Sequence, residues 1–183
     1  MSEENTSNLK FFLKIGLTLL AICAVVAGLL AAINGLTKDK IAENEKGAVA
    51  QYIEQIFGDN FASYEEAEGS AANVEAVYTV KLKDGRDAYC FRATGNGFGG
   101  AVTFIIGTDT EGNLVGIKTL SHSETPGVGT KAVDNDAGYL ENYEGVAAAD
   151  AGSVDAKSGA TYSTKAIKSA VAAVADYLAA NNG

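Results

Sequence analysis

A run of nineteen residues without a charge, Ile15–Ile33, constrains the fold of this chain more than any other feature. Three further apolar residues, 11–13, extend the run on the other side of Lys14. A helix rises about 1.5 Å per residue, so this stretch is long enough to cross the roughly 30 Å hydrocarbon layer of a bilayer. We therefore predict a transmembrane helix over residues 11–33, preceded by a short tail, 1–10.

Two other interpretations of the same run are possible. A cleaved signal peptide would have too long an apolar region, although the small residues Ala31 and Ala32 suit a signal peptidase. A lipoprotein signal ending at Cys23 is disfavoured because the large Ile22 precedes it. We interpret the run as an uncleaved anchor. Lysines lie on both sides of it, so the positive-inside rule does not decide its orientation.

The charge and the cysteines exclude several classes of partner and site. The formal net charge is −9, and because residues 1–33 carry two Glu and two Lys, the whole excess lies in residues 34–183. So acidic a segment argues against nucleic acid and is repelled by anionic lipid headgroups. The cysteines are Cys23, inside the apolar run, and Cys90, and the single histidine is His122. We therefore predict no metal or iron–sulfur site formed by this chain alone.

Helical periodicity continues beyond the apolar run. From Thr37 onward apolar residues repeat on one side, and we predict a connecting amphipathic helix over residues 34–58 that Gly58-Asp59-Asn60 ends. The residues that form its apolar side are Val49, Tyr52, Ile53, Ile56 and Phe57. Residues 59–73 are acidic and small, so we expect a loop or a short irregular helix there. The predicted folded domain is residues 59–183.

The remaining domain has the pattern of an antiparallel sheet followed by a helix. Four β-branched and aromatic segments predict strands at Val74–Leu82, Ala88–Thr94, Ala101–Thr108 and Leu114–Leu120. An Asp-Gly turn joins the first two strands, and a polar turn at 109–113 joins the second two, giving two hairpins. A final helix is predicted by an apolar stripe at Ile167, Ala170, Val171, Val174 and Leu178. The predicted class is α+β, with an antiparallel sheet flanked by helices.

A hydroxyl-rich segment, Asp155-Ala-Lys-Ser-Gly-Ala-Thr161, leads directly into this last helix. The free N–H groups of a first helical turn and the positive end of the helix dipole favour an anion, and phosphate is a frequent occupant. Taken alone, however, serine and threonine before a helix are most often simple N-caps.

A second unusual segment, Ser121–Gly129, holds the only His and the only Pro of the chain. One proline and two glycines within nine residues predict a rigid loop. A lone histidine is more often a structural hydrogen-bonding group than a catalyst. A hydrolase is disfavoured because Ser121 and His122, as neighbours on an extended segment, point to opposite sides. Upstream, Phe98 lies among the four glycines of Gly95–Gly100, where the backbone can approach a flat ligand.

The two segments together resemble a known family. His122-Ser-Glu-Thr-Pro-Gly-Val-Gly129 reads H-x-E-T-P-G-x-G, and residues 155–161 match the flavinylation motif D-x-x-(S/T)-G-A-(T/S) at every specified position. This pair is similar to the FMN-binding domain shared by the G-subunit of the Rnf complex and the C-subunit of the sodium-pumping NADH:quinone reductase. The N-terminal span, the segment Leu36–Asn44 and the glycine-rich turn also fit that family. The short chain favours the Rnf protein.

The resemblance implies a covalent cofactor. A separate flavin transferase would join FMN to Thr161 through a phosphoester. The remaining candidate cofactor-binding residues are, in the first motif, Ser158, Gly159 and Ala160, and, in the second, His122, Glu124, Thr125, Gly127 and Gly129. No residue is expected to catalyse a reaction of its own.

The resemblance further implies a membrane-anchored electron carrier of an ion-translocating ferredoxin:NAD oxidoreductase, associated with its other membrane and redox subunits. On this basis the tail, 1–10, is expected in the cytoplasm and the FMN domain on the extracytoplasmic side of the cell membrane, with a single pass through the lipid. The alternatives are the C-subunit of the quinone reductase, a cofactor-free anchored binding module in which residues 158–161 only cap a helix, and, least favoured, an anchored hydrolase using His122.

Overall fold

The computed structural model describes residues 3–181, with the side chains of residues 3–10, Asp39 and Ala42 left aside. The predicted tail, 1–10, therefore lies outside the residues whose side chains are described. The chain divides into two units, Met1–Lys46 and Gly47–Gly183. A single long helix, α1, Glu3–Phe57, makes up the described part of the first unit and continues into the second.

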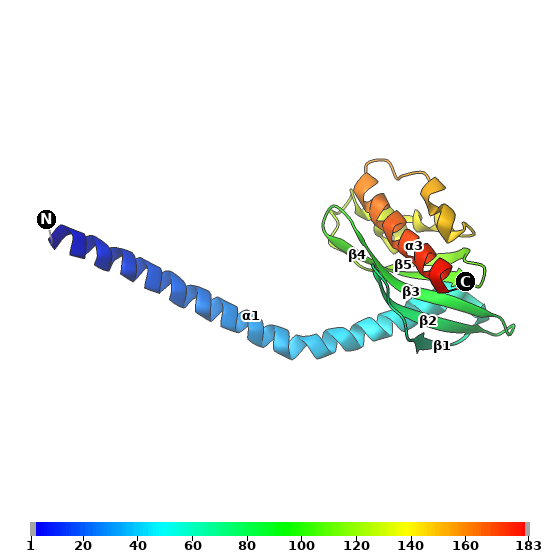
Figure 1. Cartoon of the computed structure of the whole chain (residues 1–183), viewed down its shortest axis with the longest axis horizontal. Helices are drawn as coiled ribbons and strands as arrows, with labels where there is room; N and C mark the ends of the chain where they lie inside the picture. The colour runs from blue at the N-terminus through cyan, green and yellow to red at the C-terminus, as the bar shows by residue number, and fades with distance from the viewer. Residues whose placement is uncertain (1–2, 182–183) are drawn as a thin grey trace. The chain divides into compact units, whose positions relative to one another are not determined.

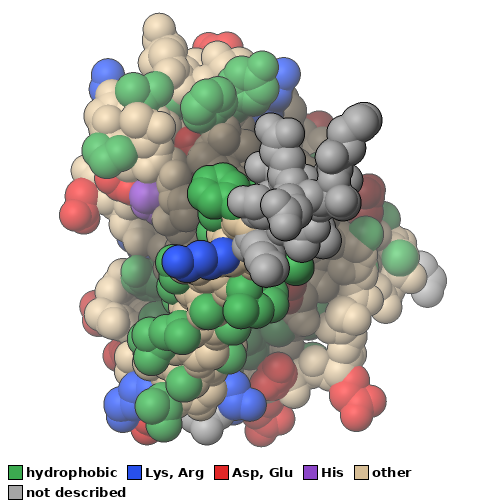
Figure 2. Space-filling model, turned by 90° about the vertical axis from the view of Figure 1, so that its left-hand side faces the viewer, with side chains coloured by type: hydrophobic (Ala, Val, Ile, Leu, Met, Phe, Trp, Pro, Cys, Tyr) green, Lys and Arg blue, Asp and Glu red, His purple; other side chains and the backbone are tan. Residues whose placement is uncertain are grey.

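The first unit is an apolar helix. Its segment Phe11–Lys38 is long and apolar enough to cross a membrane, by length and composition. Its large apolar side chains are exposed rather than packed on protein, for example Leu17 and Leu36. Figure 2 shows hydrophobic side chains open to the surroundings on the face that it presents. An apolar surface of this kind is what a lipid environment would cover.

The second unit contains a five-stranded antiparallel sheet whose strands follow one another in chain order, β1-β2-β3-β4-β5 (Figure 1). The strands are β1, Phe61–Ala67; β2, Val74–Leu82; β3, Asp87–Asn96; β4, Ala101–Asp109; and β5, Leu114–Ser121. Four of them are at the positions predicted from sequence, so the α+β prediction with an antiparallel sheet is confirmed. The glycine-rich segment makes one more hairpin, β3–β4, in which Gly97 N–H donates to Gly100 O at 2.8 Å.

The prediction of a loop or short irregular helix over residues 59–73 is wrong for residues 61–67, which form a strand. Gly58–Asn60 forms a short 3-10 turn that ends α1 as expected, and β1 then begins at Phe61. Within β1 no residue is fully buried, and Glu65 and Glu66 face solvent. Charged residues are common on edge strands, where they discourage pairing with other chains, and they also remove the apolar alternation by which a strand is recognised.

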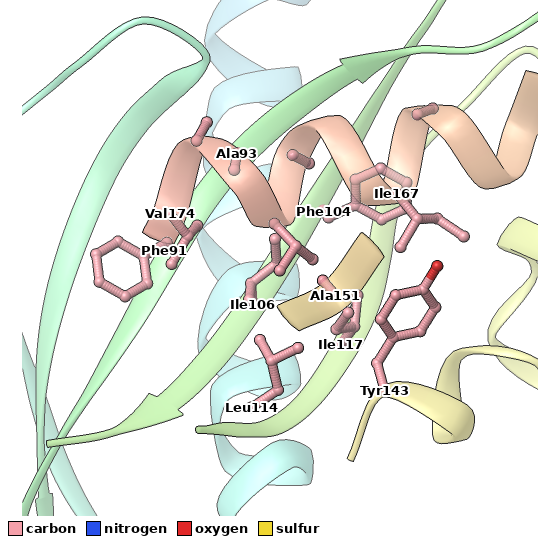
Figure 3. Close-up of a cluster of buried hydrophobic side chains, with 14 of the residues drawn as sticks. Phe91, Ala93, Phe104, Ile106, Leu114, Ile117, Tyr143, Ala151, Ile167 and Val174 are labelled. Carbon is pink, nitrogen blue, oxygen red and sulfur yellow. The ribbon is translucent and has the colours of Figure 1, made fainter. Parts of the chain in front are cut away.

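One face of the sheet packs against α3, Thr161–Asn181, which lies across it (Figure 1). Side chains from the strands and from α3 point toward one another in this core, together with Tyr143 and Ala151 from two short 3-10 segments (Figure 3). These segments are η3, Leu140–Tyr143, and η4, Ala148–Ser153. The core includes, from the sheet, Phe91, Phe104, Ile106, Leu114 and Ile117 and, from α3, Ile167 and Val174.

The other face of the sheet is covered by the last three turns of α1. Val49, Ile53 and Phe57 pack there against a second buried cluster, which includes Cys90 and Ile105 of the sheet. Burial on both faces explains why β4 has a continuous buried run rather than alternation. The stripe predicted from sequence for this helix is thus part of the core of the second unit.

Candidate functional site

The segment Ser158–Thr161 forms a tight turn that leads directly into α3. Gly159 adopts a left-handed backbone conformation, with φ of +78°, which glycine takes without steric cost. The N–H of Ala160 donates to Lys157 O at 2.9 Å, and the N–H of Thr164 donates to Ala160 O at the same distance. The helix therefore begins at the threonine of the motif.

The first turn of α3 carries hydrogen-bond donors that the helix itself cannot satisfy. Thr164 is the first residue whose N–H bonds back into the helix. The N–H groups of Thr161, Tyr162 and Ser163 come before it and have no carbonyl partner within α3. The side chains of Thr161 and Tyr162 are exposed. Together with the helix dipole, this arrangement favours an anion beside Thr161.

A pocket of about 230 Å³ adjoins this turn. It lies between the start of α3, the loop after β5 and the β3–β4 turn. Its lining residues are Phe98, Glu124, Thr125, Val128, Gly129, Gly159, Ala160, Thr161, Tyr162 and Ser163. Of the nine candidate residues from the two sequence motifs, six are brought together here although the motifs are some thirty residues apart in the chain.

The other three candidates, Ser158, His122 and Gly127, do not line this pocket. Ser158 is exposed on the turn before α3. Gly127 has a left-handed φ of +74°, and its N–H donates to Thr130 Oγ1 at 2.8 Å. It therefore shapes the loop after β5.

His122 is held by protein groups at both ring nitrogens. Nδ1 accepts the N–H of Glu124 at 3.2 Å, and Nε2 lies 2.9 Å from Asp134 Oδ1. Because Nδ1 is an acceptor, the neutral ring carries its proton on Nε2 and donates it to Asp134. Neither nitrogen is left to activate a serine, which speaks against the hydrolase alternative.

Glu124 connects the chain segments that form the site through two hydrogen bonds. It is buried, with 5% of its surface exposed, and each carboxylate oxygen accepts a hydrogen bond. The N–H of Gly99, in the β3–β4 turn, donates to Oε1 at 3.0 Å. The hydroxyl of Ser163, in the first turn of α3, donates to Oε2 at 2.6 Å. The carboxylate therefore ties the start of α3 to the turn that carries Phe98.

Three glycines leave the space that this carboxylate and its backbone occupy. A Cβ on Gly97 would lie 2.1 Å from Glu124 Oε1, and one on Gly129 would lie 2.1 Å from Oε2. A Cβ on Gly99 would lie 2.0 Å from the carbonyl oxygen of Ser123. The sequence predicts that the glycines of 95–100 let the backbone approach a flat ligand; in the structure Gly97 and Gly99 also leave room for Glu124 and Ser123.

Exposed apolar side chains surround the pocket. Phe98 is 73% exposed and Tyr162 is 62% exposed, and their ring centroids are 5.9 Å apart with the planes tilted by 56°. Val128 is half exposed beside them. Among the described residues of the second unit, one further large apolar side chain is exposed, Val115, and less so, at 36%. The aromatic pair is thus the main exposed apolar feature of this unit.

Sequence reasoning missed Tyr162, Ser163 and Val128 as residues of this site. Tyr162 and Ser163 directly follow the motif. Residues of the first helical turn surround an anion bound at the helix start, so the position of these two residues could have identified them as part of the site. The Ser163–Glu124 bond spans 39 residues of sequence and gave no local signal. Among the described residues there is no group of three or more His, Cys, Asp or Glu that could hold a metal ion.

Two family models match the chain. The model of the FMN-binding domain matches residues 97–176, which contain both motifs and the whole pocket. The model of the RnfG N-terminal region matches residues 1–56, which correspond to almost all of α1.

Curated relatives match over nearly the full length. These relatives are named as the G-subunit of an ion-translocating oxidoreductase complex. The protein from Shewanella piezotolerans is 28% identical, and the match covers 88% of this chain and 87% of the relative. The protein from Stutzerimonas stutzeri is 29% identical, and the match covers 82% of this chain and 74% of the relative. The protein of the same name in Vibrio atlanticus is 27% identical, with 92% and 91% covered. The chain therefore carries a region similar to the RnfG N-terminal region followed by one similar to the FMN-binding domain, and it resembles proteins named as the G-subunit of an ion-translocating oxidoreductase complex over most of their length.

Proposed function

We propose that this chain is a membrane-anchored electron carrier, a subunit of an ion-translocating oxidoreductase complex, whose FMN is attached through a phosphoester to Thr161. The observation that carries the proposal is the position of Thr161. Its exposed side chain lies at the start of α3, beside first-turn N–H groups that the helix cannot satisfy and beside a pocket, within a segment that matches the FMN-binding domain.

The residues around Thr161 fit the phosphate end of FMN. A phosphodiester keeps one negative charge, which the first-turn N–H groups and the helix dipole would stabilise, the dipole by about 0.3–1 kcal/mol. Gly159 presents no side chain to the phosphate, and Ala160 is small and buried and does not crowd it. Ser158, exposed on the same turn, can donate a further hydrogen bond.

The aromatic residues fit the flat end of FMN. The pocket volume of about 230 Å³ is below the range of about 300–1,000 Å³ that is typical of complete ligand pockets. Only part of an FMN would fit inside, and the exposed side chains of Phe98, Val128 and Tyr162 would hold the ring system. Aromatic rings offset from one another are favourable neighbours for such a ring.

The redox chemistry belongs to the flavin, which carries one or two electrons when bound. The chain contributes the attachment point, the pocket and the membrane anchor. The relatives named as complex subunits support assembly with other membrane and redox subunits, and their name and the RnfG N-terminal match favour the Rnf protein over its quinone-reductase counterpart. The FMN-binding match counts against a cofactor-free module. Maturation would require a flavin transferase.

Covalent attachment has a clear advantage if the FMN domain lies outside the cytoplasm, as we propose. A flavin lost there would not be replaced from the cytoplasmic pool, and a phosphoester removes dissociation altogether. The anchor, Phe11–Lys38, would then cross the lipid once and hold the carrier at the complex.

Substitution at Thr161 tests the proposal. Protein matured in cells that contain the transferase is run on a denaturing gel and viewed for flavin fluorescence. Thr161→Ala should abolish the fluorescent band, and Thr161→Ser should retain part of it because the hydroxyl remains. Ser158→Ala, which removes the neighbouring exposed hydroxyl, should stay fluorescent. Fluorescence that persists in folded Thr161→Ala would rule out this attachment site.

A further inference from the structure

Glu124 places a buried negative charge in the wall of the pocket. Its hydroxyl contact, Ser163 Oγ to Oε2 at 2.6 Å, is in the range of about 2.5–2.7 Å that is typical of a hydrogen bond to an ionised carboxylate. The second oxygen accepts from a backbone N–H, as an acceptor-only group does. No described Lys, Arg or His forms an ion pair with this carboxylate.

Among the described residues, no charged side chain near the pocket offsets the field of Glu124 through an ion pair. His122, two residues away, is directed through Nε2 to Asp134. Lys165 lies with its Nζ 5.5 Å over the ring of Tyr162, but its side chain is exposed, so water and salt screen it. A charge buried beside a low-dielectric pocket acts much more strongly on the occupant than an exposed one.

We propose that Glu124 lowers the midpoint potential of the flavin attached beside it. The inference rests on the proposed function, because it concerns the flavin on Thr161. Two-electron reduction adds one negative charge to the flavin when two electrons and one proton are taken up. A fixed negative charge in the pocket wall makes that uptake less favourable. Glu124 is thus a tuning residue that acts through its field, in addition to holding the two segments together.

Two substitutions separate the charge of Glu124 from its structural role. Glu124→Gln removes the charge and keeps the shape, because the amide oxygen can accept from Gly99 N–H while the amide nitrogen donates to Ser163 Oγ. Ser163→Ala keeps the charge and removes the hydroxyl dipole that offsets it. A charge effect therefore raises the potential in the first variant and lowers it in the second. Loosening of the pocket would shift both in one direction.

The test is a spectroelectrochemical titration at pH 8 of the detergent-solubilised full chain carrying its flavin, in which an electrode supplies the electrons and water the proton. The control is Glu111→Gln, which removes an exposed carboxylate in the turn at the opposite end of β4. We expect a positive shift for Glu124→Gln, a negative shift for Ser163→Ala and an unchanged potential for Glu111→Gln. Thermal unfolding of each variant confirms that it is folded.

Each outcome decides the inference. An unchanged or lowered potential in flavin-loaded Glu124→Gln, or equal shifts in both site variants, would overturn it and leave the proposed function intact. If Glu124→Gln does not load flavin, Ser163→Ala decides alone, and anything but a negative shift overturns the inference. A wild-type chain that carries no flavin after exposure to the transferase would overturn the proposed function, and this inference with it.

Discussion

Gly129 shows how one missing methyl group supports the site. Its Cα lies against the Glu124 carboxylate, and an added Cβ would approach Oε2 to 2.1 Å and Ser163 Oγ to 2.7 Å. Both atoms are hydrogen-bonded to each other and buried, so neither can move away cheaply. We expect Gly129→Ala to lower the free energy of unfolding by about 1–3 kcal/mol, the usual cost of overpacking a core.

Urea unfolding followed by circular dichroism measures this loss. Gly152→Ala is the matched control, because a Cβ there would meet nothing within 4 Å. Its stability should stay within about 0.5 kcal/mol of wild type. Equal stability of the two variants would show that Glu124 is not packed against Gly129 as described.

The residues of the site differ in how far sequence could reveal them. The Ser158–Thr161 segment was recognisable because its residues are contiguous and precede a periodic helix. The need for small residues at positions 97 and 129 comes from one side chain, Glu124, which reaches both from a different segment. Such a contact depends on the tertiary fold, and no local pattern encodes it.

At the scale of elements, the last three turns of α1 are as much a part of the folded core as the sheet. Val49, Ile53 and Phe57 are buried on the sheet face opposite α3. We expect residues 47–183 to form a soluble, monomeric domain. Residues 59–183, the domain bounds predicted from sequence, would instead expose Cys90 and Ile105 and should aggregate.

Size-exclusion chromatography and far-UV circular dichroism of the two truncated chains distinguish these cases. Ile53→Ala within residues 47–183 gives a finer measure, because its side chain is fully buried. It should cost about 2–5 kcal/mol of unfolding free energy, as large-to-small core substitutions do. If residues 59–183 proved as soluble and stable as 47–183, this part of α1 would be only a connector.

The elements that sequence predicted share a strong periodic signal. Strands β2 to β5 are rich in β-branched and aromatic residues and are bounded by turn residues. Strand β1 is half-buried and carries two adjacent glutamates, so its pairing with β2 comes from the tertiary fold rather than from its own pattern. The sequence likewise does not predict which end of the membrane segment faces the cytoplasm, because lysines flank both ends.

At the scale of the whole molecule, the proposed extracytoplasmic position of the FMN domain makes a labelling prediction. Glu144→Cys, at an exposed position, is introduced with Cys23→Ala and Cys90→Ala, so that one thiol remains. A membrane-impermeant maleimide should label it in intact cells, wall-stripped where needed. Labelling only after lysis would place the domain in the cytoplasm and remove the reason given for covalent attachment.

The native Cys90 thiol supplies an internal control for that experiment. Cys90 is fully buried, and burial raises its pKa well above the usual value, so little thiolate exists near neutral pH. With Cys23→Ala alone, the folded protein should resist the maleimide and react only after denaturation. Rapid native labelling at Cys90 would show that α1 does not cover this face of the sheet.

The mass of one peptide tests most directly whether FMN is attached to Thr161. Cleavage after lysine releases Ser158–Lys165 from the chain, and this peptide contains Thr161 together with four other hydroxyl side chains. In protein purified from membranes of cells that make the complex and its transferase, we expect this peptide to be heavier by FMN less one water. Fragmentation should place the added mass on Thr161. An unmodified peptide, or the added mass on Ser158 or Ser163, would contradict the account.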